Sequence, residues 1–289
     1  MQVKARIYGA VEAISPPILF RLFKGSFMYR VIVRSLRAFS SNVTASQETV
    51  STGVLAGAKL RLDARGAWQQ AMLHDTYDVE LFESLTKFPL TGKIVYDIGA
   101  HVGYHSLKFA ALVGTTGHVY AFEPNPTNNE RIEEHLALNP ELARRITLCP
   151  CALSDTVGKT TFVSSADVDG GTSSGGFIDD ASTLWAKRDY IEKTGFVTST
   201  VTRNTIDALI DSGELTPPDL IKIDVEGAEQ LVLAGGKNTL TEHHPHILIE
   251  FHSIFSTYDC MRQLAELGYK TSLLKHEDDG RVIAIAHHP

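Results

Sequence analysis

Seven short apolar runs recur along the chain from residue 94 almost to its end, and helical patterns separate most of them. The clearest helical patterns cover residues 104–112, 127–138 and 228–234. The runs are Ile94–Ile98, Val119–Phe122, Ile146–Cys149, Leu220–Ile223, Ile247–Glu250, Lys270–Leu274 and Val282–Ala286. Strands that alternate with helices predict an α/β fold, in which helices cover both faces of a mainly parallel sheet.

The stretch VYDIGAHVGYHS, residues 95–106, lies where the first of these strands turns into a helix. In an open parallel sheet, ligands bind at this kind of turn. Gly99 and Gly103 allow tight backbone geometry and the close approach of a ligand. A dinucleotide fingerprint needs glycine at its first, third and sixth positions, which here are Gly99, His101 and Tyr104. The turn is therefore poorly suited to a pyrophosphate.

Two acidic residues narrow the choice of ligand. Asp97 stands at the end of the first strand, where a carboxylate repels phosphate but suits an ammonium or sulfonium group. Glu123 follows 20 residues after Gly103, at the end of the second strand, and is placed to bind both hydroxyls of a ribose. An adenosine ligand with a cationic tail satisfies both acids, and S-adenosylmethionine is such a ligand.

At this point the chain resembles a known family. The resemblance runs from about Thr76 to Ala286, and IDVEGAE is its most specific part. The segments that carry it, in order, are HDTYDVELFESL, VYDIGAHVGYHS, VYAFEPNPTNNERIEEHLALNP, CALSD, PDLIKIDVEGAEQLVLAGG and ILIEFH. Together they resemble the FkbM-type methyltransferases, which have the Rossmann-like class I fold and use S-adenosylmethionine.

The resemblance implies a cofactor site at the ends of the first and second predicted strands. It places Asp97, Gly99 and Gly103 at the methionine end of the cofactor and Glu123 at the ribose. It places Asn125, Ser154 and Asp155 near the adenine. His101 departs from the asparagine common at its position, which leaves its role open. We expect Tyr104 and His105 to shape the pocket near the methyl group.

The resemblance also implies that Asp224 and Glu226 face the methyl group and an acceptor hydroxyl. We expect the base to be Asp224, Glu226 or His252, in that order. From the residues alone, Asp224 and Glu226 could instead cap the helix that begins near Gly227. Glu250 and His252 share a face of a strand and could be a buried pair. The four side chains lack the spacing typical of metal ligands, so we expect no metal site.

Charge divides the chain unevenly. The net charge is −7, yet residues 1–45 carry about +6, because seven basic residues stand there against Glu12. The acidic remainder argues against a nucleic acid partner and suits a small-molecule or saccharide acceptor. We expect residues 1–53 to form a basic amphipathic helical extension with a Ser- and Thr-rich linker, and residues 54–289 to form the methyltransferase domain.

The sequence leaves the role of the basic extension open. It could contact a membrane surface or a partner, or pack on its own domain or on a second subunit of a homo-oligomer. Without a signal-peptide pattern, we expect a cytoplasmic protein, peripheral at the inner membrane face if the extension binds lipid. The Gly- and Ser-rich stretch 167–176 is a spacer or a lid. Two other functions stay open: a non-catalytic scaffold and an NAD-dependent oxidoreductase.

Overall fold

The computed structural model describes residues 45–165, 175–179, 196–276 and 280–289. The chain divides into two units, residues 1–44 and residues 45–289, and the second contains all the described residues. The helices expected in the basic extension, and most of the loop expected at 167–176, therefore lie outside the described residues. Among the helices that are described, none is long and apolar enough to cross a membrane.

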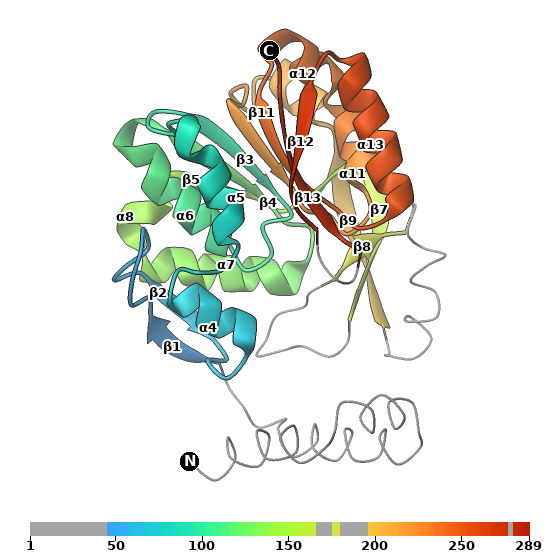
Figure 1. The fold of residues 1–289 in the computed structure, drawn as a ribbon. Helices are drawn as coiled ribbons and strands as arrows, with labels where there is room; N and C mark the ends of the chain where they lie inside the picture. Colours follow the sequence, from blue (N-terminus) through green and yellow to red (C-terminus); the bar gives the residue numbers. More distant parts are fainter. Residues whose placement is uncertain (1–44, 166–174, 180–195, 277–279) are drawn as a thin grey trace, which may run out of the picture. The chain divides into compact units, whose positions relative to one another are not determined.

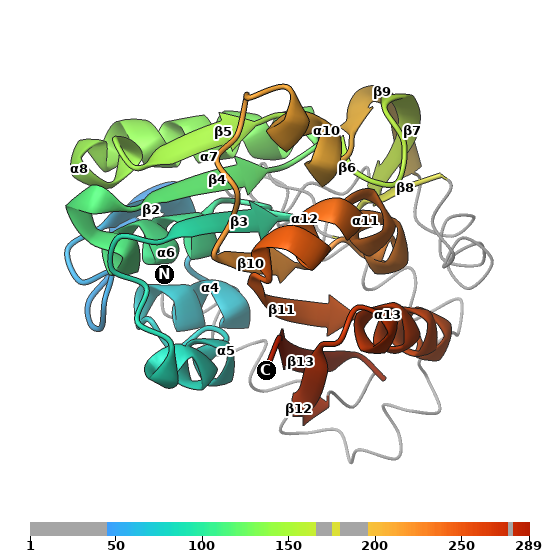
Figure 2. The same cartoon turned by 90° about the horizontal axis from the view of Figure 1, so that it is seen from above.

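A seven-stranded sheet organises the described unit, in the order β12-β13-β11-β10-β3-β4-β5 (Figures 1 and 2). The strands are β3 (Ile94–Ile98), β4 (His118–Phe122), β5 (Ile146–Cys149), β10 (Leu220–Ile223), β11 (His246–Phe251), β12 (Lys270–His276) and β13 (Val282–His287). The first five run parallel, and β13 is antiparallel to both of its neighbours. The mainly parallel sheet predicted from the seven apolar runs is confirmed.

Helices cover both faces of this sheet. Successive side chains of each strand point to opposite faces, so a strand that is buried throughout packs against helices on both sides. In β3, Val95 packs in one buried cluster, whereas Tyr96 and Ile98 pack in the other. The first cluster takes residues from α4 (Ala67–Leu73), α5 (Val79–Ser84), α6 (Tyr104–Val113) and α7 (Pro126–Leu138). The second takes residues from α10 (Ile206–Asp211), α11 (Glu229–Gly235), α12 (Lys237–His243) and α13 (Ile254–Glu266). Shorter elements are η1 (Leu85–Lys87), η2 (Gly114–Thr116) and α8 (Pro140–Ala143).

A short antiparallel pair precedes the large sheet. β1 (Ser46–Thr49) pairs with β2 (Lys59–Leu62), and Val50 and Leu55 between them are buried in the core. β1 thus lies within residues 1–53, for which we expected a helical extension and a linker. Its polar sequence is compatible with a strand because β1 is largely exposed. We therefore propose a boundary near residue 45 in place of 54.

A second sheet, in the order β6-β9-β7-β8, lies beside the carboxyl ends of the parallel strands (Figure 2). Its strands are β6 (Ala152–Leu153), β7 (Gly158–Ser165), β8 (Phe177–Ile178) and β9 (Phe196–Asn204). β7 and β9 form a long antiparallel pair. This sheet was not predicted from the sequence, and it supplies apolar side chains to the site described next.

Candidate active site

A cavity of about 540 Å³ lies at the carboxyl ends of the parallel strands. Gly99 follows β3, Glu123 follows β4, Asp224 follows β10, and Glu250 and His252 stand at the end of β11. The volume of the cavity lies within the range typical of small-molecule sites. The position is the one at which open parallel sheets bind ligands.

The second sheet closes the cavity with apolar side chains. Leu153 from β6, Phe162 from β7, and Phe177 and Ile178 of β8 all line it. On another side, the aromatic rings of Trp68 and Tyr77 contribute to the wall. The cavity therefore combines an acidic end with apolar and aromatic walls, as ligand sites commonly do.

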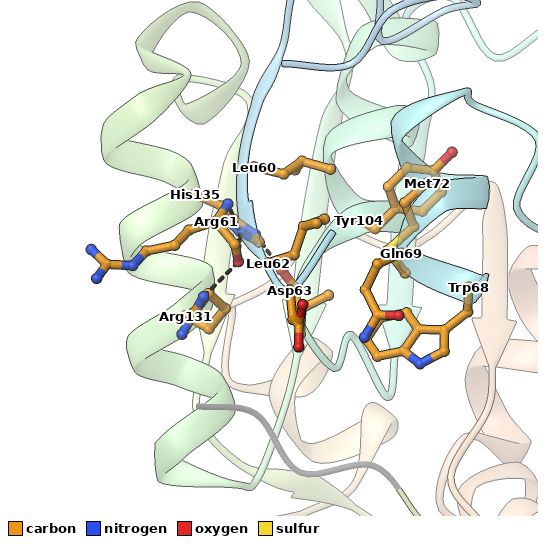
Figure 3. A pocket seen from close by; sticks show the side chains of 11 residues that line it. Leu60, Arg61, Leu62, Asp63, Trp68, Gln69, Met72, Tyr104, Arg131 and His135 are labelled. Carbon is orange, nitrogen blue, oxygen red and sulfur yellow. Dashed lines mark hydrogen bonds between the residues drawn. The ribbon is translucent and has the colours of Figure 1, made fainter. Parts of the chain in front are cut away.

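A much smaller cavity lies between β2, α4 and α7 (Figure 3). It measures about 10 Å³, which is room for about one water molecule. Arg131 Nη1 donates to the carbonyl oxygen of Arg61, and His135 Nε2 accepts from the Arg61 amide. These bonds fasten β2 to α7, so the small cavity has a structural setting and is no substrate site.

The glycine turn brings the backbone close to the end of β10. Gly99 has φ +80°, and a Cβ at this position would lie 1.8 Å from the carbonyl oxygen of Asp224. Gly103 has φ +78° and precedes α6. His101 between them also has a positive φ, +53°, and it lines the cavity. Burial lowers the pKa of His101 to about 4, so its imidazole is neutral at physiological pH.

Glu123 is held by the glycine turn and by the start of α7. Its carboxylate accepts from the amides of His101, at 2.8 Å, and Asn125, at 2.9 Å. Asn128, which the sequence reasoning missed, donates to it at 3.3 Å. Burial raises the pKa of Glu123 to about 7, although these hydrogen bonds act in the opposite direction. The carboxylate is thus pre-positioned at the cavity wall.

Several expected cofactor residues do not line the cavity. Only Gly99, His101 and Glu123 do so, among the nine that were expected to contact the cofactor. The others are Asp97, Gly103, Tyr104, Asn125, Ser154 and Asp155. Two of these residues form hydrogen bonds within the protein: Tyr104 Oη donates to Asp75, and Asn125 accepts from Thr127 at the start of α7.

Asp97 and the segment that contains Ser154 are the clearest cases. Asp97 is fully buried, accepts from Ser106 Oγ at 2.5 Å and lies 3.3 Å from Lys222 Nζ. Lys222 thus already pairs with the charge of Asp97 in the absence of a ligand. Ser154 is also fully buried, and its hydroxyl donates to the exposed Asp155.

The three expected catalytic residues lie together. His252 Nε2 is 3.5 Å from Asp224 Oδ1 and 3.7 Å from Glu226 Oε2. It is also 3.7 Å from Glu250 Oε1, so the Glu250–His252 pair expected from the strand pattern is part of the same cluster. All four side chains line the cavity. The N-cap residue of α11 is Ala228, so neither Asp224 nor Glu226 occupies the N-cap position of this helix.

Two cations balance this acidic cluster. Lys222 Nζ lies 3.4 Å from Asp224 Oδ2, and Arg281 Nη1 donates to Glu250 Oε1 at 2.6 Å. Burial would raise the pKa of Asp224, but Lys222 and His252 outweigh burial and lower it to about 2. Burial and the charge of Asp224 raise the pKa of Glu250 to about 7. The cluster thus contains acids of very different proton affinity.

His252 is the most basic member of the cluster. Burial lowers its pKa, but the hydrogen bond with Glu229 and the charges of Glu226, Glu229 and Asp224 outweigh burial and raise it to about 9. Sequence reasoning missed both Glu229 and Lys222. A lysine between two isoleucines in the strand Leu220–Ile223 was a signal, since a buried lysine needs an acidic partner.

Comparison with known proteins identifies the family of the chain. The model of the methyltransferase FkbM domain family matches residues 97–271. Hexuronic acid methyltransferase AglP of Haloferax volcanii is 28% identical over 188 residues, which are 64% of this chain and 67% of that protein. The 2-O-methyltransferase NoeI of Sinorhizobium fredii is 31% identical over 152 residues, 52% of this chain and 59% of that protein.

A solved structure supports the same fold. Methyltransferase FkbM from Methylobacillus flagellatus superimposes with a TM-score of 0.51 at 18% identity, and the match covers 75% of this chain and 53% of that one. At this identity the likeness concerns the fold alone. The family match covers more than half of the chain and includes the glycine turn and the acidic cluster. The chain therefore belongs to the FkbM family of S-adenosylmethionine-dependent methyltransferases.

Proposed function

We propose that this protein transfers the methyl group of S-adenosylmethionine to a hydroxyl of a saccharide or a related small metabolite. The observation that carries the proposal is the gathering of Asp224, Glu226, Glu250 and His252 in the cavity that also contains Glu123. An alcohol has a high pKa, so a base beside the reacting oxygen assists its methylation. The names of the relatives AglP and NoeI, a hexuronic acid methyltransferase and a 2-O-methyltransferase, support this acceptor class.

The cavity fits the cofactor on its own geometry. Glu123 presents a fixed carboxylate that suits the two ribose hydroxyls, and Phe122 and Leu153 beside it offer an apolar surface to the adenine. Gly99 leaves the backbone free of a side chain at the turn. For the residues behind the wall, namely Asp97, Gly103, Tyr104, Asn125, Ser154 and Asp155, we propose supporting roles in place of direct contact.

The cofactor, when bound, supplies a methyl group already activated on a sulfonium sulfur. The protein then needs to align the acceptor oxygen, exclude water and take up the hydroxyl proton. We assign the proton to His252 Nε2, which lines the cavity and whose pKa of about 9 exceeds those of Asp224 and Glu250. Asp224, first in the order expected from the sequence, is too acidic for this role and is better suited to orienting the hydroxyl.

The aromatic wall supports a saccharide acceptor. Trp68 and Tyr77 line the cavity, and both have apolar ring faces that suit the C–H face of a sugar. We expect Trp68→Ala to raise KM for the acceptor more than it lowers kcat. A screen of sugars with free 2-hydroxyls and of glycans that contain hexuronic acid would identify the acceptor.

Binding of S-adenosylmethionine, measured by calorimetry, tests the cofactor site. We expect micromolar binding by the wild type and a loss of about 1–3 kcal/mol in Glu123→Ala, because the ribose loses hydrogen bonds to a carboxylate. Glu130→Ala, at an exposed position of α7, is the matched control and should bind as the wild type does. Folded wild-type protein that binds no S-adenosylmethionine would refute the proposal.

The pH dependence of kcat/KM tests the base. His252 with a pKa near 9 is protonated at neutral pH, so kcat/KM should rise as the pH increases toward 9. His252→Ala should lose this rise and most of the activity. A rise that is complete near pH 7 would point to Glu250, whose pKa is about 7.

The proposal uses no metal ion, because Lys222 and Arg281 already pair with Asp224 and Glu250. Activity should survive dialysis against EDTA unchanged.

The basic, amphipathic sequence of residues 1–45 supports contact with an anionic membrane face. Pelleting with anionic vesicles that is lost on deletion of residues 1–45 would establish this contact, and light scattering of both proteins would measure oligomerisation.

A further inference from the structure

Glu229, the first residue of α11, is a fully buried acid that lies behind the cavity. A buried carboxylate is costly unless donors surround it. Three segments supply them: the amide of Gly227 donates at 2.8 Å, the hydroxyl of Ser256 in α13 donates to the other oxygen, and His252 Nδ1 lies at 2.8 Å. The position of the carboxylate is thereby set by the turn, by α13 and by the end of β11.

The contact with Nδ1 determines where the rest of the imidazole faces. Because Glu229 accepts from Nδ1, the other ring nitrogen, Nε2, is directed at Asp224, Glu226 and Glu250 at 3.5–3.7 Å. The His252 side chain is only 5% exposed, so packing leaves it little freedom to turn. A neutral His252 in this arrangement carries its hydrogen on Nδ1 and a lone pair on Nε2.

The charged groups around His252 come from every element packed against it. Glu229 belongs to α11, Asp224 and Glu226 belong to the turn after β10, and Glu250 belongs to β11 itself. Lys222 and Arg281 face these acids and pair with Asp224 and Glu250. Of the four acids, Glu229 alone approaches Nδ1, and it does so from outside the cavity, since it is not among the lining residues.

We propose that Glu229 is a positioning residue, which holds the His252 imidazole with Nε2 toward the acceptor hydroxyl and stabilises the imidazolium formed during methyl transfer. This inference rests on the proposed function. The acceptor oxygen forms the bond to the methyl carbon, the carbon–sulfur bond breaks, and sulfur keeps the electron pair. The hydroxyl proton moves to His252 Nε2. The resulting positive charge lies 2.8 Å from the Glu229 carboxylate. A base oriented by a third group in this way is common in nucleophile activation.

Titration of His252 in the protein without ligands is the first test. NMR of the wild type, with the His252 signal identified by its loss in His252→Gln, should show a pKa above the ordinary 6.5. Glu229→Gln keeps the shape of the side chain and removes its charge, so it should lower that pKa by at least about one unit. A wild-type pKa at or below 6.5 would overturn the inference without any variant of Glu229.

Kinetics then separate positioning from a merely structural role. In Glu229→Gln, the rise of kcat/KM with pH should move to lower pH, and the maximal kcat should fall about 10- to 100-fold with little change in the affinity for S-adenosylmethionine. Ser256→Ala removes one donor to Glu229 and leaves its charge, so its pH profile should match that of the wild type. An unmoved profile in Glu229→Gln would contradict the inference.

The two tests also distinguish this inference from the proposed function. If the protein methylates no hydroxyl but Glu229→Gln lowers the His252 pKa, the pairing stands and the proposed function fails. If methylation depends on His252 but its pKa does not respond to Glu229, the function stands and the role of Glu229 fails.

Discussion

Gly99 shows how little space separates the glycine turn from the end of β10. Alanine there combines a backbone conformation at φ +80° with a Cβ 1.8 Å from the carbonyl oxygen of Asp224. Gly57 has φ +89° but no atom within 4 Å of an added Cβ. Gly57→Ala should therefore cost about 1–2 kcal/mol of unfolding free energy, from backbone strain alone, and Gly99→Ala should cost about 3 kcal/mol or more. Urea unfolding measures both; equal losses would contradict the close contact.

Sequence reasoning identified residues of this site that belong to a local pattern. Gly99, Glu123, Asp224, Glu226 and His252 follow strand ends, and the carboxyl ends of parallel strands meet at one edge of the sheet. The direction in which each side chain points was harder to predict from the sequence. Asp97 also ends a strand, yet it faces Ser106 and Lys222 and not the cavity.

Glu229 and Lys222 were missed for a related reason. Their roles depend on partners that are distant in sequence, 23 residues away for the Glu229–His252 pair and 125 residues away for the Lys222–Asp97 pair. A single sequence does not reveal such contacts between side chains. An acid or a lysine beside an otherwise apolar run nevertheless signals a buried pair.

At the scale of elements, a buried ion pair joins the end of α4 to α6. Asp75, after α4, accepts from Tyr104 Oη at 2.6 Å and from the amide of Val54 at 2.7 Å, and lies 2.8 Å from Lys108 Nζ in α6. Burial raises the pKa of Asp75, but Lys108 and Tyr104 outweigh burial and lower it below its usual value. The stabilisation is therefore present above pH 3.8 and is lost as the pH falls through the lowered pKa.

Removal of this charge should be costly at neutral pH. Asp75→Asn leaves the buried Lys108 without its carboxylate, and we expect a loss of about 3–5 kcal/mol, as measured by urea unfolding at pH 7. Asp63→Asn, whose partner Arg65 is exposed, is a control that should cost less than about 1 kcal/mol. The difference between Asp75→Asn and the wild type should shrink at pH 3. A difference that does not depend on pH would contradict the assigned charge.

The elements themselves were predictable where their pattern was strong. The seven apolar runs became the seven strands of the large sheet. The central strands β3 and β10 are almost entirely buried, whereas the edge strand β12 is largely exposed. β7 and β9 were missed, although both contain β-branched Thr and Val residues, which favour strands. Their pairing joins segments about 40 residues apart and cannot be inferred from either alone. β1 was missed because its side chains are polar and largely exposed.

For the whole molecule, bound cofactor should stabilise the fold in proportion to its affinity. S-adenosylmethionine at a hundred times its Kd adds about 2.7 kcal/mol, which for a domain of this size corresponds to a rise in Tm of about 5–10 °C. Differential scanning fluorimetry measures the rise. Glu123→Ala, at the same cofactor concentration, should show a clearly smaller rise. The same rise in the variant would place the cofactor away from Glu123.

The pairing of β7 with β9 has a consequence for how such enzymes diversify. Ser165 and Phe196, at the ends of these strands, are register partners, so the intervening segment leaves and rejoins the sheet at one place. A longer segment between the same two anchor points loses little stability, because the entropic cost of closing a loop rises by only about 0.6 kcal/mol for each doubling of its length. Three residues of this region line the cavity: Phe162 in β7, and Phe177 and Ile178 of β8, which lies between β7 and β9 in the sequence. These three side chains lie outside the strands that precede Gly99 and Glu123, so we expect substitutions there to change the preference for the acceptor while binding of the cofactor is retained.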